Sequence, residues 1–112
     1  MKIFQLEKQY YPCINVAFMH FMFHHFEEAN EYAKKAREIC LQLRNKGRDS
    51  YWIAATEAEA SLILGQDEAA CESYESAFKR EDAQPSSIAS TRKQALQSAG
   101  MFEDESIRER ME

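Results

Sequence analysis

The scarcity of glycine and proline limits what this chain can fold into more than any other feature of its sequence. It has three glycines and two prolines in 112 residues, whereas β-turns and Gly-rich phosphate-binding loops need many of both. Gly47, Gly65 and Pro85 separate stretches in which apolar residues recur at helical spacing. The chain is therefore predicted to be all-α, and its 45% hydrophobic residues suffice for the core of one domain.

Five helices are expected from this spacing and from the residues that favour helix ends. Their predicted ranges are about 10–24, 27–44, 51–64, 68–79 and 86–99. Pro12 is expected in the first turn of the first helix, a position where helices tolerate proline. Residues 100–112 form a charged tail, for which a frayed helix and disorder are both open.

The first four segments contain an internal repeat with an offset of 41 residues. Residues 13–37 and 54–78 share five identities at this offset, and three of them are alanines: Ala17/Ala58, Ala29/Ala70 and Ala36/Ala77. Small residues at fixed places allow two helices to approach closely, and Tyr74 can fill the space between helices. We therefore expect one domain over residues 1–99, with hairpins at about 10–44 and 51–79 and a capping helix at about 86–99.

This order of small and aromatic residues is typical of tetratricopeptide repeats. The stretches YYPCINVA (10–17), DSYWIAATEAEA (49–60), LILG (62–65) and ASTRKQ (89–94) resemble the TRAF-binding, tetratricopeptide-like region of apoptosis-signal-regulating mitogen-activated kinase kinase kinases and related bacterial repeat proteins. The resemblance implies a short right-handed solenoid that acts as a protein–protein interaction module without an active site. Where the family has Gly-Asp in the first hairpin turn, this chain has His24-His25.

The same resemblance implies a concave groove lined by the first helix of each hairpin. The matching positions are Tyr11, Ile14, Phe18, Phe21, Met22, Trp52, Ala55, Glu59, Leu62 and Ile63. Because this set is mainly apolar and aromatic, it suits a partner helix or peptide or a second copy of the chain, with Trp52, Tyr11 and Phe18 as anchors. Alternatively, the fifth helix, the tail or the first ten residues cover the groove, with Phe4, Leu6 or Phe102 as plugs.

The three histidines lie close together in the sequence. His20 and His24 have the i, i+4 spacing that places two imidazoles on one helix face, and Glu28 or water could complete a zinc site. A small metal- or ligand-binding regulatory protein that uses His20, His24 and His25 is therefore the alternative function. Packing at a helix end is the favoured interpretation, because the chain lacks an HExxH motif and the intervening residues are apolar. No metal or other cofactor is predicted.

Cysteines and motifs give little support to catalysis. Cys13, Cys40 and Cys71 form no CxxC pair, which is typical of reduced, buried thiols in a cytoplasmic protein. The sequence has no Gly-rich loop, GxSxG motif or paired catalytic carboxylates, so we do not expect an enzyme. The longest apolar-rich run, residues 13–23, is about half as long as a membrane-spanning helix, so no membrane association is predicted.

Charge is unevenly distributed along the chain. The net charge of −5 argues against nucleic-acid binding. Residues 1–50 carry 8 basic and 6 acidic side chains, a net charge of +2, whereas residues 51–112 carry 6 basic and 13 acidic side chains, a net charge of −7. A solvated helix face explains most such runs, but complementary halves also favour stacking of copies. A homo-oligomer is therefore predicted.

Overall fold

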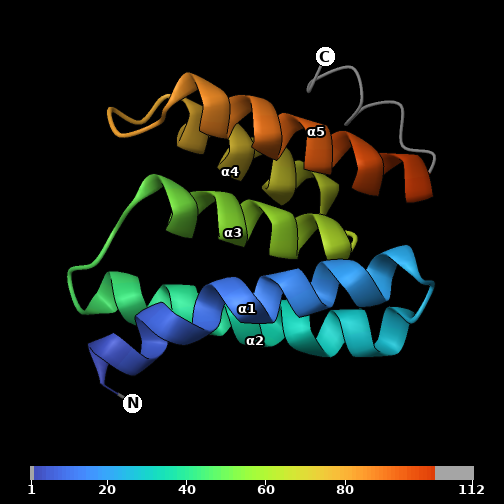
Figure 1. Cartoon of the computed structure of the whole chain (residues 1–112), viewed down its shortest axis with the longest axis horizontal. Helices are drawn as coiled ribbons and strands as arrows, with labels where there is room; N and C mark the ends of the chain where they lie inside the picture. The colour runs from blue at the N-terminus through green and yellow to red at the C-terminus, as the bar shows by residue number, and fades with distance from the viewer. Residues whose placement is uncertain (1, 103–112) are drawn as a thin grey trace.

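A computed structural model describes the backbone of residues 2–102 and the side chains of residues 2–98 (Figure 1). The helices are α1 (Ile3–Met22), α2 (Phe26–Asn45), α3 (Tyr51–Ile63), α4 (Asp67–Phe78) and α5 (Pro85–Phe102). No strand occurs among the described residues. The prediction of an all-α chain with five helices is therefore confirmed for this part of the protein.

The helices are arranged as two antiparallel hairpins and a fifth helix. Helices α1 and α2 form the first hairpin, α3 and α4 form the second, and α5 lies against the second hairpin (Figure 1). In Figure 1, α1, α3 and α5 face the viewer, and α2 and α4 lie behind them. Helix α3 packs against α1 and α2 on one side and against α4 and α5 on the other. It is therefore the central element of the fold.

The alanines of the internal repeat are all inside the helix interfaces. Each of the six is 0% exposed: Ala17, Ala29, Ala36, Ala58, Ala70 and Ala77. Tyr74 is 1% exposed and packs against the alanines and leucine of the second hairpin. The small side chains thus lie where helices come close together, as the repeat predicted.

The two hairpin turns have the same hydrogen bonding. The amide of His25 donates a 2.8 Å hydrogen bond to the carbonyl of His20. In the second turn, the amide of Gln66 donates a 2.9 Å hydrogen bond to the carbonyl of Ser61. In each turn, the residue before that amide has a positive φ, 64° at His24 and 78° at Gly65. Both turns are Schellman motifs, the helix ending in which a left-handed residue closes the last turn, and they lie 41 residues apart.

Helix α1 begins earlier than predicted. It starts at Ile3, so Pro12 lies inside the helix and not in its first turn. Leu6 is in phase with Ile14 on the buried face of α1, and it is 0% exposed in the core of the first hairpin. Pro12 is exposed, so the carbonyl of Lys8 that loses its amide partner faces the solvent side. Burial of Leu6 thus extends the helix past the proline.

The last helix also differs from its predicted range. Helix α5 starts at Pro85, as expected for a proline in a first helical turn, and it continues to Phe102. The first three residues of the predicted tail, 100–102, therefore belong to the helix. The remainder of that tail, residues 103–112, lies outside the described residues.

Candidate functional site

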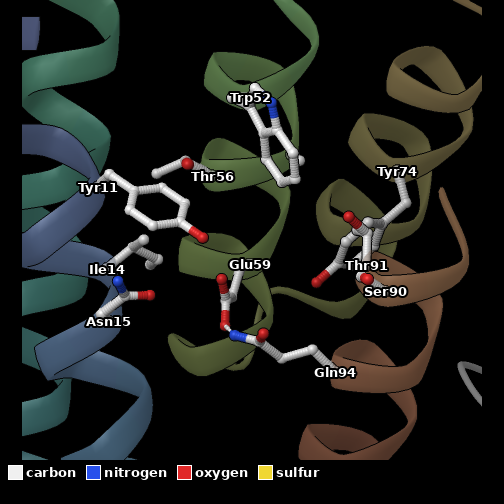
Figure 2. Close-up of a pocket in the computed structure, with 11 residues that line it drawn as sticks. Tyr11, Ile14, Asn15, Trp52, Thr56, Glu59, Tyr74, Ser90, Thr91 and Gln94 are labelled. Carbon is white, nitrogen blue, oxygen red and sulfur yellow. Dashed lines mark hydrogen bonds between the residues drawn. The ribbon is translucent and has the colours of Figure 1, made fainter. Parts of the chain in front are cut away.

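A pocket of about 180 Å³ opens between α1, α3 and α5 (Figure 2). Side chains at one-turn spacing on each helix line it: Tyr11, Ile14 and Asn15 from α1; Trp52, Ala55, Thr56 and Glu59 from α3; Tyr74 from α4; and Ser90, Thr91 and Gln94 from α5. On α3 these positions follow i, i+3, i+4, i+7, which places them on one helix face. The lining is therefore mixed, with apolar, hydroxyl, amide and carboxyl groups.

Two aromatic side chains form the rim of the pocket. Tyr11 is 48% exposed and Trp52 is 41% exposed, and their rings meet edge to face with centroids 6.1 Å apart. The ring of Tyr51 meets the ring of Trp52 edge to face, with centroids 5.1 Å apart. The hydroxyl of Tyr51 in turn donates a 2.7 Å hydrogen bond to Oγ1 of Thr91 on α5. The rim thus consists of two large, half-exposed rings that contact each other and neighbouring aromatic rings of α1 and α3.

Glu59 brings an ionisable group to the floor of the pocket. Its carboxylate accepts a hydrogen bond from the Nε2 of Gln94 across the α3–α5 interface (Figure 2). Burial raises the pKa of Glu59 to about 7, although the hydrogen bond from Gln94 partly opposes this rise. Burial, and then the charge of Glu59, raise the pKa of Tyr74 well above its ordinary value. At neutral pH, Glu59 can therefore act as a hydrogen-bond donor or as an anion.

The predicted groove residues occupy two different places. Tyr11, Ile14, Trp52, Ala55 and Glu59 line the pocket together. The others belong to the hydrophobic interior or pack against it: Phe18 and Met22 are partly buried, and Phe21, Leu62 and Ile63 are at most 2% exposed. Helix α3 has neighbours on several sides, so only one stripe of its residues faces the pocket. Partner binding by any of these residues stays a prediction.

Two of the three predicted plugs, Phe4 and Leu6, are not among the residues that line this pocket. Leu6 is buried in the core of the first hairpin, and Phe4 is 65% exposed, while the side chain of Phe102 lies outside the described residues. Helix α5 instead forms one wall of the pocket through Ser90, Thr91 and Gln94. Sequence reasoning missed these polar residues, although their i, i+4 spacing on the predicted capping helix indicates a common face.

The histidines do not pair as their spacing predicted. His20 approaches His25, with the two Nδ1 atoms 3.3 Å apart. Because α1 ends at Met22, the helical spacing no longer applies to His24, whose ring packs against Phe26 at 5.5 Å. A carboxylate oxygen of Glu28 completes a group whose candidate ligand atoms all lie within 4.8 Å of one another. The pairing of His20 with His24 is therefore wrong, and His25 takes the place of His24.

The three cysteines are free and buried. Cys40 is 0% exposed, and burial raises the pKa of its thiol to about 12. Such a thiol is a poor nucleophile because the reactive thiolate is disfavoured. The prediction that the cysteines are buried small side chains is confirmed.

None of the helices over residues 2–102 has the length and apolar content needed to cross a membrane. No protein-family model, curated protein or solved structure matches the chain.

Proposed function

We propose that the chain is a non-enzymatic, tetratricopeptide-like interaction module that binds a segment of a partner protein in the pocket between α1, α3 and α5. The observation that carries this proposal is the pair of half-exposed rings, Tyr11 and Trp52, at the rim of the pocket. Aromatic side chains in such positions commonly provide most of the binding energy of protein interfaces. They present a large contact area and lose little conformational entropy, because neighbouring rings already hold them in place.

The internal repeat supports the tetratricopeptide-like part of the proposal. Two hairpins have matching buried alanines and matching Schellman turns 41 residues apart. In addition, the first helices of successive units lie on one face of the molecule, as Figure 1 illustrates for α1, α3 and α5. The pocket lies on this face, where a stack of helical hairpins presents its binding surface.

The pocket floor indicates the chemistry of the partner. Glu59 lies beneath the rim, and a carboxyl group whose pKa is shifted by burial inside a pocket is typical of functional sites. A basic side chain entering the pocket would stabilise the ionised form of Glu59 and contact the faces of the rim rings. Residues 51–112 carry a net charge of −7, which also favours a basic partner. The proposed partner segment is therefore an apolar stretch next to a lysine or arginine.

The test uses peptides selected from a random displayed library on the full-length chain. We expect the selected peptides to combine apolar residues with a basic residue. Trp52→Ala and Tyr11→Ala should each weaken their binding by about tenfold or more, measured by calorimetry. Leu41→Ala is the matched control, because Leu41 is 57% exposed on α2, outside the pocket, and it should leave binding unchanged.

Two further measurements separate the alternatives. Thermal unfolding of Trp52→Ala shows whether the loss of binding reflects a loss of folding. Sedimentation of the chain alone tests whether a second copy occupies the pocket, in which case Trp52→Ala should shift the protein towards the monomer. Selected peptides that bind both rim variants as tightly as the original chain would contradict the proposal.

A further inference from the structure

A second group of side chains lies at the turn between α1 and α2, and none of its members lines the pocket. His20, at the end of α1, and His25, at the start of α2, place their Nδ1 atoms 3.3 Å apart. Glu28, in the first turn of α2, adds a carboxylate oxygen within 4.8 Å of both imidazoles. Two imidazole nitrogens and a carboxylate oxygen are ligands that Zn²⁺ commonly uses in proteins.

The separation of the two nitrogens fits a shared metal ion. With Zn–N bonds of about 2.0–2.1 Å, two nitrogens at a tetrahedral angle lie about 3.3–3.4 Å apart. A direct hydrogen bond between the rings would ordinarily be shorter, at about 2.9–3.0 Å between heavy atoms. The observed 3.3 Å between His20 and His25 is within hydrogen-bonding distance, and it also matches the span of two ligands on one ion.

The backbone of the turn produces this pairing. In a Schellman motif, the amide two residues after the C-cap residue donates to the carbonyl three residues before it. These two residues therefore lie side by side, and both are commonly apolar. Here that pair is His20 and His25, joined by the 2.8 Å bond from the amide of His25 to the carbonyl of His20. The equivalent pair in the second hairpin, Ser61 and Gln66, has no imidazole. The histidine pair thus distinguishes the first turn from an otherwise matching one.

Neighbouring groups hold the candidate ligands and leave them accessible. The ring of Tyr32 stacks on His20, with centroids 5.7 Å apart and an angle of 13° between the planes. Glu28 is the third residue of α2, which places it in the first turn of this helix. His20 is partly buried, whereas His25 and Glu28 are exposed. An ion between them can therefore be reached from solvent and can keep a water ligand.

We propose that His20, His25 and Glu28 bind one divalent transition-metal ion, with Zn²⁺ as the best fit, at the turn of the first hairpin. Each histidine contributes its Nδ1 atom and Glu28 contributes a carboxylate oxygen, so the ion joins the end of α1 to the start of α2. Because the metal contacts the folded turn, it stabilises the hairpin. This site is independent of the proposed peptide-binding pocket.

The experiment titrates the tag-free, full-length chain with ZnCl₂ at mildly alkaline pH, where imidazoles are neutral. We expect one ion per chain by calorimetry and a rise in Tm of about 5 °C or more at saturation, reversed by a chelator. Substitution of Co²⁺ should give the visible absorption of a low-symmetry site. His20→Ala and His25→Ala should each abolish the Tm shift, and Glu28→Gln should weaken binding by about tenfold or more.

His24→Gly is the matched control, because His24 lies between the two ligands in sequence but packs against Phe26. This variant should bind Zn²⁺ as tightly as the original chain, and a glycine suits its positive φ. The proposal is overturned by the absence of any Zn²⁺-dependent Tm shift. It is equally overturned if His25→Ala retains full binding or if His24→Gly loses it.

Discussion

Glu59 links the stability of the protein to pH at the scale of a single residue. Its pKa is raised from 4.5 to about 7 by burial, so the folded state binds this proton more strongly than the unfolded state does. The contribution of Glu59 to stability is therefore fully present below pH 4.5 and is lost as pH rises through about 7. In the folded state, the protonated form of Glu59 gives way to the anion as pH rises through about 7.

Glu59→Gln should remove this pH dependence, because glutamine stays neutral and can still accept the hydrogen bond from Gln94. Above pH 7.5, we expect the variant to be more stable than the original chain by roughly 1–3 kcal/mol. Near pH 4 the two should differ little. Urea unfolding at a series of pH values measures the difference, and the exposed Glu31→Gln provides the control. A constant difference across this range would show that the ionisation of Glu59 is not responsible.

The sequence predicted Glu59 as a groove residue but not its environment. Its position on the same face of α3 as Trp52 follows from helical spacing, and its position near Tyr11 of α1 follows from the repeat. Its burial depends on Gln94 and Tyr74, which come from two other helices. Spacing within one helix carries no information on such contacts, so the shifted pKa could only be found in the structure.

The two hairpin turns give a prediction at the scale of the helices. His24 has a φ of 64° and Gly65 a φ of 78° in equivalent turns. A residue with a side chain adopts the left-handed backbone conformation at a cost of about 1–2 kcal/mol. Glycine adopts this conformation without strain, but it loses more conformational entropy on folding. His24→Gly should therefore stabilise the protein by about 0.5–1 kcal/mol, and Gly65→Ala should destabilise it by about 1 kcal/mol. Thermal unfolding measures both.

Gly47, which ends α2 with a φ of 81°, is the natural comparison for this pair. Within the described part of the chain, no neighbouring atom lies within 4 Å of an added Cβ at Gly47 or Gly65, so substitution by alanine tests backbone strain without overlap with these residues. Gly47→Ala should lose about as much stability as Gly65→Ala. A lower Tm for His24→Gly would mean that the contact of His24 with Phe26 outweighs the strain.

Helix ends were predicted well where a breaker marks them and poorly where tertiary burial decides. Gly47 and Gly65 follow the ends of α2 and α3 within a few residues of the predicted limits. The start of α1 differs from the prediction because Pro12 is typical of a first helical turn, whereas the burial of Leu6 extends the helix to residues before the proline. A proline on the exposed face of a helix removes one hydrogen bond but does not end the helix.

At the scale of the whole molecule, a polar network joins two connections that are distant in sequence. Arg80 donates to Asp82 at 2.9 Å and to Asp49 at 3.1 Å, and Asp82 accepts a 2.9 Å hydrogen bond from the amide of Tyr51. The network therefore ties the α2–α3 connection to the α4–α5 connection. The hydrogen bonds from Arg80 and then from Tyr51 hold the pKa of Asp82 below its ordinary value.

Asp82→Asn should weaken this connection in a pH-dependent way. Because the folded pKa of Asp82 is lowered, its contribution is present above its ordinary pKa near 3.8 and is lost as pH falls through the folded value. The variant should therefore have a lower Tm than the original chain at neutral pH, and the gap should close in strong acid. Glu81→Gln, at the exposed neighbouring residue, is the control. A gap that is unchanged in acid would contradict an ionic origin.

The assembly of the helices was only partly accessible from the sequence. The repeated alanines predicted which positions lie in helix interfaces, and all six are fully buried. Periodicity does not state which neighbour covers a face, however. Leu62 and Ile63 were predicted in the groove because they match groove positions of tetratricopeptide repeats, but α3 is central and buries them in the interior.

Trp52 is the sole tryptophan of the chain and is half exposed at the pocket rim. Fluorescence excited at the red edge of protein absorption therefore originates from one known place. The natural chain thus carries its own optical reporter of what enters the pocket, with no dye or label attached near the binding surface. The histidine cluster lies at the turn between α1 and α2 and shares no residue with the pocket lining, so the same emission band can be followed while metal is added, and the two sites can be studied in a single sample.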